Sequence, residues 1–575
     1  KAIGEKFAID PVVARIIRNR DMIEESDIAS YLYGDVTMLE DPRTMKDLVK
    51  AVHIIKEKII AGKKIQVIGD YDIDGIQSSY ILWSALKSCG ARVDVAIPNR
   101  IIDGYGLNER LIQEAYEDGV DTIVTCDNGI AADEVISRAK SLELTVIVTD
   151  HHEVPYEETE SGRQYKIPCA DAVVNPKQAD CPYPFKGLCG AGVAYKLAQV
   201  LFEEMGKEKE AIWEYLPYAA FATVGDVMDL IGENRILVKE GLKRLSHAGN
   251  LGLKALMVQN GLEPKDIRSY HIGFILGPCL NASGRLDTAI RALRLLQADS
   301  EKEATELAKD LTDLNISRKD LTAKGVEQAD VLAREALEQG DKVLVLFLPD
   351  CHESLAGIIA GRIREKYNHP VFVLTRGEEG VKGSGRSTPA YSMYEEMCKT
   401  KELFTKFGGH PMAAGVSLAE DNVPAMRQRL NELTTMTEED FVPKVMIDVP
   451  MPIDYITPQL VKGLSILEPF GKGNEKPVFA DKGLRLLSAR ILGKNKNVLK
   501  MRIQSSQGRE MDAMYFGDIE KFKNYVEEKF TKEAVKSLFE GKEYGAGITM
   551  SFVYYPEINS FNGRESLQIV VKNYC

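Results

Sequence analysis

Three short apolar runs in the sequence are each followed at once by side chains that bind metals or protons. The three clusters are Asp70, Asp72 and Asp74 after KKIQVIG (63–69), Asp127-Asn128-Gly129 after DTIVTC (121–126), and Asp150-His151-His152 after LTVIVT (144–149). Like charges gathered at one place repel one another unless a cation or protons neutralise them. Helix capping explains a single residue such as Asp74, but not the density of acids or the histidine pair. The pattern therefore predicts a metal site.

The ligand types indicate which metal and which chemistry. Carboxylates with imidazole suit Mn²⁺ or Mg²⁺ better than they suit a zinc site built on thiolates. The number of acids favours two ions about 3.5–4 Å apart, which clamp the attacking and leaving oxygens during phosphoester hydrolysis. A further acid, Asp226, follows the apolar run AAFATV (219–224) and gives a weaker signal of the same kind.

Two glycine-rich segments in the second half of the chain are compatible with phosphate binding. They are GSGRSTP (383–389), in which Arg386 lies in a loop of glycine and serine, and FGGHPMAAG (407–415), in which His410 follows Gly408 and Gly409. Glycine lets backbone N–H groups approach an anion, although each segment alone is more often a turn. GLCGAG (187–192) lacks the strand-to-helix context of a dinucleotide site, and no Walker A motif supports ATP-driven chemistry.

Strands and helices alternate around the acidic clusters. Strand-like runs occur at 63–69, 91–98, 121–126 and 144–149, and helical patterns occur at 76–90, 107–119 and 132–143. Strands separated by helical segments of this length predict βαβ units and a parallel sheet. Ligands bind just beyond the carboxyl ends of the strands in such a sheet, so the three clusters are expected to meet at one edge.

A long helix and a second α/β unit are expected next. Residues 300–337 form one amphipathic pattern, whose leucines are Leu307, Leu311, Leu314 and Leu321. We interpret this pattern as a packed helix that bridges two domains. A strand at 342–349, a helix around 354–367 and a strand at 369–375 then predict a smaller α/β domain.

After about residue 450 the alternation of strands and helices gives way to strand-like runs. Strand-like runs occur at 497–505, 547–555 and 565–573, and the aromatic residues among the basic ones are Tyr515, Phe516, Phe552, Tyr554 and Tyr555. Residues 481–575 hold 16 basic and 12 acidic side chains. This composition suits a small β-barrel on which bases stack, and it suits ordinary aromatic packing in a β domain equally well.

Composition restricts the class of protein. The chain has 575 residues, of which 44% are hydrophobic and 28% charged, so a mainly disordered chain is excluded. The net charge of −13 excludes a uniformly basic surface but leaves room for a local basic groove. Nine scattered cysteines without a CxxC pair predict reduced thiols in the cytoplasm. No run is long enough for a membrane helix, and the first residues lack the apolar region of a signal peptide.

In combination and in this order, the motifs resemble the DHH phosphoesterase superfamily. The shared motifs are DYDIDG (70–75), the turn 127–129, the triplet 150–152 and GGH (408–410). Others resemble one branch, the RecJ family of bacterial single-stranded-DNA exonucleases. These are GYGL (104–107), TVGDVMDL (223–230), IGFILGPCLNASGRLD (272–287), SGRS (384–387) and LEPFGKGNEKPVF (467–479). The resemblance covers nearly the whole chain, from about residue 46 to residue 575.

The resemblance implies an α/β architecture and a function. It implies a parallel-sheet DHH catalytic domain (46–299), a long connecting helix (300–337), a smaller α/β DHH-associated domain (338–450) and a C-terminal OB-type β-barrel (451–575). The mixed helix and loop pattern of residues 1–45, which precede the resemblance, predicts an N-terminal cap. The implied function is metal-dependent 5′→3′ hydrolysis of single-stranded DNA in DNA repair and recombination. A single-strand-binding protein and a helicase are the implied candidate partners, and no membrane is expected.

The same resemblance assigns roles to residues. The implied metal ligands are Asp72, Asp74, Asp127, His151 and Asp226, with Asp127 bridging two ions of Mn²⁺ or Mg²⁺. The implied catalytic residues are His152, beside the scissile phosphate, and Asp70, Arg386 and His410. The implied substrate-binding residues are Arg285, Arg386, Gly408, Gly409 and His410.

The sequence also departs from the family pattern. Several members of the superfamily have a histidine where this chain has Ile68, so either one metal is held more weakly or Asp70 helps to hold it. Cys351 and Ser354 stand where related sequences often have a large residue and a glycine, which leaves the role of His352 open.

Two other functions remain as alternatives. One is a small-substrate phosphodiesterase or oligoribonuclease of the same superfamily, and the other is a non-catalytic DNA-binding scaffold. The length of the chain and the additional barrel argue against the first. The complete set of acids and histidines argues against the second.

Overall fold

The chain forms two compact units. The computed structural model describes residues 2–100, 102–159, 162–247, 249–377, 380–493, 496–540, 547–561 and 563–575. The larger unit contains Glu40–Asp226 and Gly241–Lys444, and the smaller unit contains Lys1–Leu39, Val227–Glu240 and Val445–Cys575. None of the helices in these described ranges combines the length and the apolar character that a bilayer crossing requires.

The larger unit begins with a five-stranded sheet. Its strand order is β2 (Arg92–Ala96), β1 (Lys64–Ile68), β3 (Thr122–Cys126), β4 (Thr145–Thr149) and β7 (Ala172–Val174). All neighbouring strands are parallel, which confirms the sheet that the alternating pattern predicts. Strands β1, β3 and β4 are buried along almost their whole length, because helices cover both faces of the sheet.

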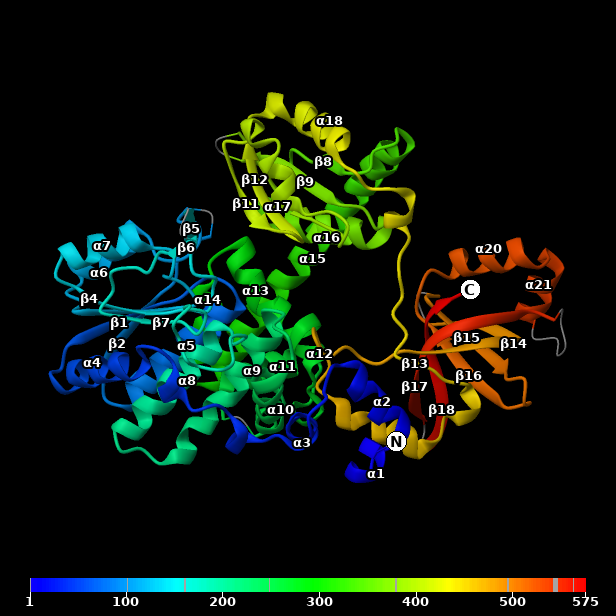
Figure 1. Ribbon diagram of the computed structural model, residues 1–575, viewed down its shortest axis with the longest axis horizontal. Coiled ribbons are helices and arrows are strands. Elements are labelled where there is room, and N and C mark those ends of the chain that lie inside the picture. Colours follow the sequence, from blue (N-terminus) through cyan, green and yellow to red (C-terminus); the bar gives the residue numbers. More distant parts are fainter. Residues whose placement is uncertain are drawn as a thin grey trace. The chain divides into compact units, whose positions relative to one another are not determined.

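The helices lie on opposite faces of this sheet (Figure 1). On one face are α6 (Glu109–Glu117) and α7 (Asp133–Ser141), and on the other are α4 (Leu48–Ile60), α5 (Ile73–Ser88) and α8 (Gly190–Glu204). Ile112 of α6 and Ile136 of α7 share one apolar core with Ile123 and Val146 of the strands. The sheet and its helices thereby form a rigid frame whose strand ends carry the acidic clusters.

A helical region follows the sheet. Its elements are α9 (Leu216–Gly225), α11 (Leu251–Gln259), α12 (Ser269–His271), a π-helical turn (Ile272–Leu276), α13 (Gly277–Leu286) and α14 (Ile290–Gln297). They lead into α15 (Glu301–Glu338), which is the long helix predicted over 300–337.

The packing face of α15 agrees only in part with the predicted leucine pattern. Its buried face consists largely of small residues, among them Ala304, Ala308, Gly325 and Ala329. Leu311 is buried as well, whereas Leu321 is 45% exposed. Small side chains form the buried face because neighbouring helices approach α15 closely. A Cβ atom on Gly325 would lie 2.4 Å from Cδ1 of Ile359 on α16 (Ala356–Tyr367).

A second sheet in the larger unit supports the glycine-rich segments. Its strand order is β11 (Lys406–His410), β12 (Ala413–Leu418), β10 (Gly380–Arg386), β9 (Val371–Gly377) and β8 (Leu344–Phe347). Only β8 and β9 are parallel. The prediction that Arg386 and His410 lie in loops is therefore wrong, because each is the last residue of a strand. Glycine is a turn signal in a sequence, but here it lies within paired strands.

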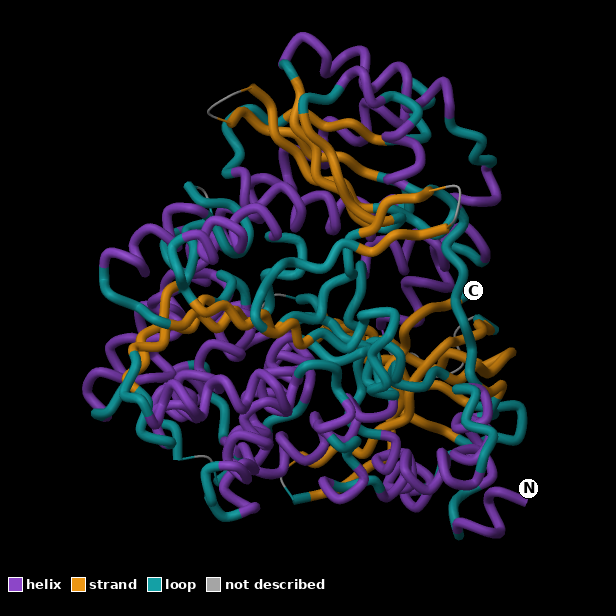
Figure 2. Tube along the Cα trace, turned by 60° about the vertical axis from the view of Figure 1, so that its left-hand side comes forward, coloured by secondary structure: helices purple, strands orange, loops and turns teal. Residues whose placement is uncertain are grey.

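The smaller unit contains a closed β-barrel. The strand order is β13 (Val449–Pro450), β14 (Phe479–Leu492), β15 (Val498–Gln504), β16 (Glu510–Tyr515), β18 (Arg564–Tyr574) and β17 (Thr549–Phe561), and β17 also pairs with β14. This pairing closes the sheet and confirms the predicted barrel. Helices α1 (Ala2–Phe7), α2 (Pro11–Asn19), α3 (Glu25–Tyr33), α19 (Pro458–Leu464), α20 (Ile519–Lys529) and α21 (Lys532–Glu540) complete the unit. In Figure 2 the barrel strands are orange and these helices purple.

The aromatic residues of the C-terminal region are mostly core residues, which favours the ordinary-packing alternative for them. Phe552, Tyr554 and Tyr555 are buried in the apolar core of the barrel. Tyr515 is half-buried and packs against the ring of Phe522. Of the five, only Phe516 is largely exposed, at 60%. Phe552 and Tyr554 are two residues apart on β17 and so lie on the same side of the strand, and composition alone does not reveal that this side is the buried one.

The segment LEPFGKGN (467–474) binds a buried arginine within the smaller unit. Arg235, which is 2% exposed, lies on α10 (Gly232–Leu245). Its guanidinium donates to the backbone carbonyls of Leu467, Glu468 and Tyr31 at 3.0, 2.9 and 3.0 Å. Because a buried guanidinium requires acceptors, this segment has a structural role.

Candidate metal centre and phosphate-binding residues

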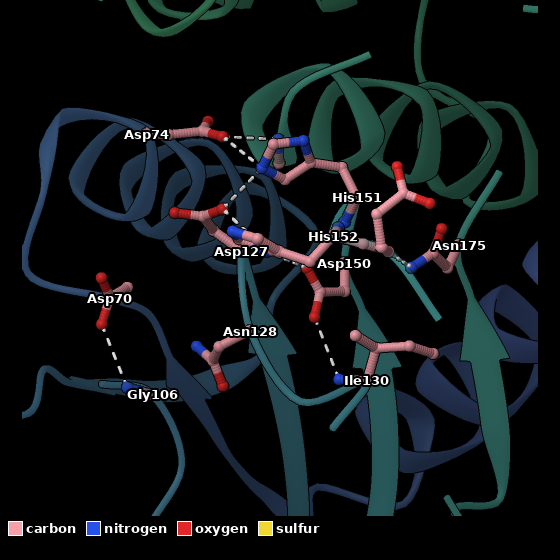
Figure 3. A network of polar contacts seen from close by, with 12 residues as sticks. Asp70, Asp74, Gly106, Asp127, Asn128, Ile130, Asp150, His151, His152 and Asn175 are labelled. Atoms are coloured by element: carbon pink, nitrogen blue, oxygen red, sulfur yellow. Dashed lines mark hydrogen bonds and ion pairs between the residues drawn. The ribbon is translucent and has the colours of Figure 1, made fainter. Parts of the chain in front are cut away.

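The predicted acids converge on one imidazole nitrogen. Nε2 of His151 lies 3.1 Å from Oδ1 of Asp127, 3.4 Å from Oδ2 of Asp74 and 3.9 Å from Oδ2 of Asp226. The residues follow β4, β3, β1 and α9, so segments far apart in the sequence supply them. Figure 3 shows Asp74 and Asp127 beside the ring of His151. The strand ends thus meet at one edge of the sheet, as the parallel topology predicts.

Three groups of side chains have the spacing of metal ligands. They are Asp74, His151 and Asp226; Asp127, His151 and His152; and Asp70, Asp72 and Asp127, with candidate ligand atoms within 4.8 Å of one another in each group. Asp127 belongs to two groups, which is the arrangement that a bridging carboxylate requires. Among the described residues, Oδ1 of Asp127 and Oδ2 of Asp70 are buried without a hydrogen-bond partner. Orphaned carboxylate oxygens beside an imidazole fit Mn²⁺ or Mg²⁺.

Asp74 is held by the N-terminus of α8. The backbone N–H groups of Gly190 and Ala191 donate to its two carboxylate oxygens at 2.6 and 2.7 Å. N–H groups in the first turn of a helix have no acceptor within the helix, so they are available to the carboxylate of Asp74. The helix dipole adds a partial positive charge at this end. The GLCGAG segment is therefore a helix N-terminus that orients a carboxylate of the chain itself.

The backbone of Asp127 is unusual. Asp127 has a φ of +61°, which is the left-handed region that residues other than glycine rarely adopt. The carbonyl oxygen of Asp127 accepts a hydrogen bond from the hydroxyl of Tyr105 at 2.7 Å. Gly190 passes so closely that a Cβ atom on it would lie 2.7 Å from Cβ of Asp127. Two segments remote in the sequence thus fix this carboxylate.

The electrostatics of the acidic clusters are those of a site built for a cation. Burial, followed by the charge of Asp72, raises the pKa of Asp70 to about 8. Burial, followed by the charges of Asp74 and Asp72, raises the pKa of Asp127 well above its ordinary value. Oδ1 of Asp72 accepts from the N–H groups of Asp74 and Gly75 and thereby caps α5. Asp72 is therefore a helix cap, and its role as a metal ligand stays a prediction.

His152 is oriented by its neighbours. Its Nδ1 lies 2.7 Å from Oδ1 of Asp150 and 3.1 Å from the hydroxyl of Tyr105. Burial alone would lower the pKa of His152, but the hydrogen bond and charge of Asp150 outweigh burial and raise it to about 9. Burial lowers the pKa of His151, which favours the neutral ring that binds metals. The two adjacent histidines thus have different electrostatic environments.

Helix α13 carries Arg285 toward the acidic cluster. A Cβ atom on Gly284 would lie 2.5 Å from the carbonyl oxygen of Tyr71, between Asp70 and Asp72, so only glycine permits this approach. Arg285 donates to the carbonyl oxygen of Ser354 at 2.8 Å and so links α13 to the second sheet's domain. Burial, with the charges of neighbouring arginines, lowers the pKa of Arg285 to about 10. The neighbouring arginines named in that effect are Arg100, Arg318 and Arg386.

Arg386 and His410 lie at the same end of the second sheet. Arg386 pairs with Ala413 across β10 and β12, and His410 pairs with the same Ala413 across β11 and β12. His410 is exposed. The two glycines before it differ: a Cβ atom on Gly409 would lie 2.4 Å from the carbonyl oxygen of Ala413, whereas Gly408 has open space around it. Gly409 is therefore needed for the backbone path of β11, and Gly408 is not.

The departures at positions 351 and 354 are accommodated locally. Oγ of Ser354 lies 2.8 Å from Nδ1 of His352 and orients that ring. Cys351 packs at the edge of the apolar core formed by α15, α16 and the second sheet.

Several residues of the site carry no signal of their own in the sequence. Their residue types alone do not indicate chemistry. These residues are Arg100, Tyr105, Gly190 and Gly284. Spatial proximity assigns their roles: Arg100, for example, lies 4.8 Å from the ring centroid of Tyr71, between two of the acids.

Comparison with known proteins agrees with this geometry. Family models match residues 64–223 as a DHH family N-terminal domain, residues 340–436 as a DHHA1 domain and residues 447–573 as a RecJ OB domain. The single-stranded-DNA-specific exonuclease RecJ of Escherichia coli is 31% identical over 98% of this chain and 96% of its own length. The chain belongs to the RecJ family.

Other members of the RecJ family are similarly related. The RecJ exonuclease of Bacillus subtilis is 34% identical over all of this chain and 69% of its own length. The crystal structure of RecJ from Thermus thermophilus in complex with Mn²⁺ has a TM-score of 0.79 and 28% identity, covering 100% of this chain and 77% of that chain. The family membership therefore extends over the whole chain and all three matched domains.

Proposed function

We propose that this chain is a metal-dependent exonuclease that hydrolyses the phosphodiester bonds of single-stranded DNA in the 5′→3′ direction. The observation that carries this proposal is the convergence of Asp74, Asp127 and Asp226 on Nε2 of His151 in a member of the RecJ family. The preference for single-stranded DNA rests on the relatives, and the direction rests on the family resemblance of the motifs. The hydrolytic chemistry rests on the ligand set.

Each residue has a proposed task. Asp72, Asp74, Asp127, His151 and Asp226 would hold two ions of Mn²⁺ or Mg²⁺, and Asp70 would complete the set in place of the histidine that Ile68 replaces. The ions would supply Lewis-acid stabilisation of the phosphate and activation of water.

The remaining site residues would position the substrate. His152, fixed by Asp150 and Tyr105, would contact the scissile phosphate. Arg285 and Arg386, with His410 at the same sheet end as Arg386, would hold the substrate phosphates. Gly409 would let β11 follow the backbone path that places His410. The domain limits in this proposal are those expected from the sequence: cap 1–45, DHH domain 46–299, connecting helix 300–337, DHH-associated domain 338–450 and barrel 451–575.

The cellular setting is also a proposal. The family resemblance implies action in DNA repair and recombination, with a single-strand-binding protein and a helicase as candidate partners. The scattered cysteines without a CxxC pair favour the cytoplasm. The barrel, which pure small-substrate phosphodiesterases do not need, disfavours the oligoribonuclease alternative. The complete ligand set disfavours a non-catalytic scaffold.

The test is direct. The purified protein should be incubated with end-labelled single strands, blunt duplexes and RNA, each with Mn²⁺, with Mg²⁺ and with a chelator. We expect degradation of single-stranded DNA from the 5′ end that requires metal, and no digestion of blunt duplexes. Rapid digestion of a blunt duplex, or cutting that survives the chelator, would contradict the proposal.

A further inference from the structure

A cavity of about 650 Å³ lies in the larger unit. Its walls come from α5, from the turn Lys209–Tyr215 and the start of α9, and from the ends of α10 and α14. No acid or histidine of the metal centre lines it. The volume is in the range of pockets that bind small molecules, about 300–1,000 Å³.

The apolar part of the wall consists of aromatic rings held in place. The ring centroids of Tyr80 and Tyr218 are 4.5 Å apart, and those of Tyr80 and Trp83 are 6.0 Å apart. The side-chain amide of Asn250 donates to the Tyr80 hydroxyl at 3.1 Å and to the carbonyl of Leu296 at 2.7 Å. A wall of fixed aromatic faces favours a flat aromatic ligand, because little side-chain freedom is lost on binding.

The polar part of the wall is charged. Lys243 and Arg244 come from the last turn of α10, and His247 follows them. The guanidinium carbon of Arg244 lies 5.3 Å from the ring centroid of Trp213, so a cation and an aromatic ring occupy neighbouring places on the wall. Two carboxylates, Glu210 and Glu214, also line the cavity and offer acceptor oxygens.

We propose that this cavity binds a nucleoside monophosphate. The base would stack against the aromatic rings, the phosphate would lie toward Lys243 and Arg244, and Glu214 would accept from a base amino group or a sugar hydroxyl. The aromatic rings favour a ligand with a flat aromatic part, and the two cations on the wall favour a ligand that carries negative charge. Mononucleotides are also the products that an exonuclease releases. The site would therefore bind the protein's own product outside the metal centre, and this part of the inference rests on the proposed function.

The chain provides its own probe for this site. Its only two tryptophans, Trp83 and Trp213, both line the cavity, so intrinsic fluorescence reports on it selectively. The protein should be titrated with dAMP, AMP, deoxyadenosine and inorganic phosphate in the presence of EDTA. We expect saturable quenching by the two nucleotides, weaker binding of deoxyadenosine and no quenching by phosphate.

Substitutions assign the signal to the cavity. The double variant Lys243→Ala, Arg244→Ala should bind dAMP about tenfold more weakly or worse, since charge-assisted hydrogen bonds to the phosphate are lost. The Asp127→Ala variant should bind as the wild type does, because Asp127 does not line the cavity. Thermal unfolding of each variant should establish that the chain is folded, and Trp83→Phe and Trp213→Phe should locate the quenching.

Three outcomes would overturn the proposal. They are no quenching at millimolar nucleotide, equal binding by the folded double variant, and quenching by an acidic peptide that nucleotides do not compete away. The last result would make the cavity a peptide-binding site. Because binding is measured without hydrolysis, failure here leaves the proposed nuclease function untouched, and an inactive enzyme leaves this inference untouched.

Discussion

Gly190 donates its backbone N–H to Oδ2 of Asp74 at 2.6 Å, although 116 residues separate the two in the sequence. The same glycine passes so close to Asp127 that no side chain fits between them. One residue without a side chain thus fixes the position of one proposed metal ligand and restricts the position of a second. The geometry of the centre depends on the first turn of α8 as well as on the strand ends.

Replacing Gly190 with alanine is expected to disable the site without unfolding the chain. The new Cβ atom would lie 2.7 Å from Cβ of Asp127, so the carboxylate must move. We expect hydrolysis of a single-stranded oligonucleotide to fall by about 100-fold, the usual consequence of a displacement of about 1 Å in a catalytic arrangement. Gly192→Ala is the matched control, because its Cβ would meet only the Leu188 side chain, at 3.2 Å. Equal losses in both variants, or none in Gly190→Ala, would contradict this account.

Mn²⁺ is expected to stabilise the protein through Asp127. At a concentration of about 100 times Kd, a ligand that binds only the folded state adds about 2.7 kcal/mol. The Asp127→Asn variant should lose most of this gain in Tm and all nuclease activity. In EDTA its Tm should equal or exceed that of the wild type, because one charge of a mutually repelling set is gone. Full activity of the variant with Mn²⁺ would refute the two-metal site.

Asp70 is expected to act as a ligand in place of the histidine missing at Ile68. Its Oδ1 accepts from the N–H of Gly106 at 3.1 Å, while its Oδ2 is buried without a partner among the described residues. Asparagine at position 70 can still accept the hydrogen bond from Gly106, but it lacks the negative charge of a carboxylate. The Mn²⁺ concentration at half-maximal activity should rise by about tenfold or more in Asp70→Asn. Asp121→Asn, a surface change beside Lys58, is the control, and an unchanged metal requirement in Asp70→Asn would assign Asp70 a structural role.

The sequence predicts what depends on local pattern. The parallel sheet, the long helix, the barrel strands and the meeting of three acidic clusters all follow from periodicity and from the rule for strand ends. Contacts between distant segments have no such local signal. The bond from Gly190 to Asp74, the link from Arg285 to Ser354 and the close passage of Gly284 past Tyr71 exist only once the helices pack.

Two sequence patterns leave the buried side undecided for a shared reason. The leucines of α15 do not reveal that small residues form most of its buried face, and the aromatic residues among basic ones suit base stacking and core packing equally well. In both cases the residue type does not reveal which way the backbone turns the side chain. Leu321 is exposed because small residues give the closer helix contact, and Tyr554 is buried because it points into the barrel.

Arg235→Ala is expected to destabilise the smaller unit. The substitution removes the guanidinium donor from the carbonyl oxygens of Tyr31, Leu467 and Glu468, of which Leu467 keeps a hydrogen bond from the Asn474 amide at 2.9 Å. Each carbonyl that is then left without a donor costs about 1–3 kcal/mol. We expect a lower Tm and a clear loss of unfolding free energy, whereas Arg18→Ala, on an exposed arginine, should change little. Arg235→Lys should recover only part of the loss, since an ammonium group cannot reach acceptors in several directions as the planar fork does. A Tm unchanged in Arg235→Ala would show that the segment 467–474 is held by other contacts.

The barrel is expected to grip long single strands through its exposed face. Arg490 and Lys500 are cross-strand partners on β14 and β15 and so point to the same side, and exposed Phe516 directly follows β16. Deleting 451–575 is a poor test, because Val13 and Ile16 of α2 belong to the barrel's apolar core and would be uncovered.

The double variant Arg490→Ala, Phe516→Ala tests this grip while keeping the core intact. It should weaken binding to long single strands by about 1–3 kcal/mol for a lost base stack, and it should lower the salt dependence by about one phosphate contact. Hydrolysis of dinucleotide-scale substrates should stay at the wild-type rate, because no proposed metal ligand lies in the barrel. Arg92→Ala on β2 serves as the matched surface control. Equal losses on short and long substrates would mean that the barrel supports the catalytic unit and does not act as a separate DNA grip.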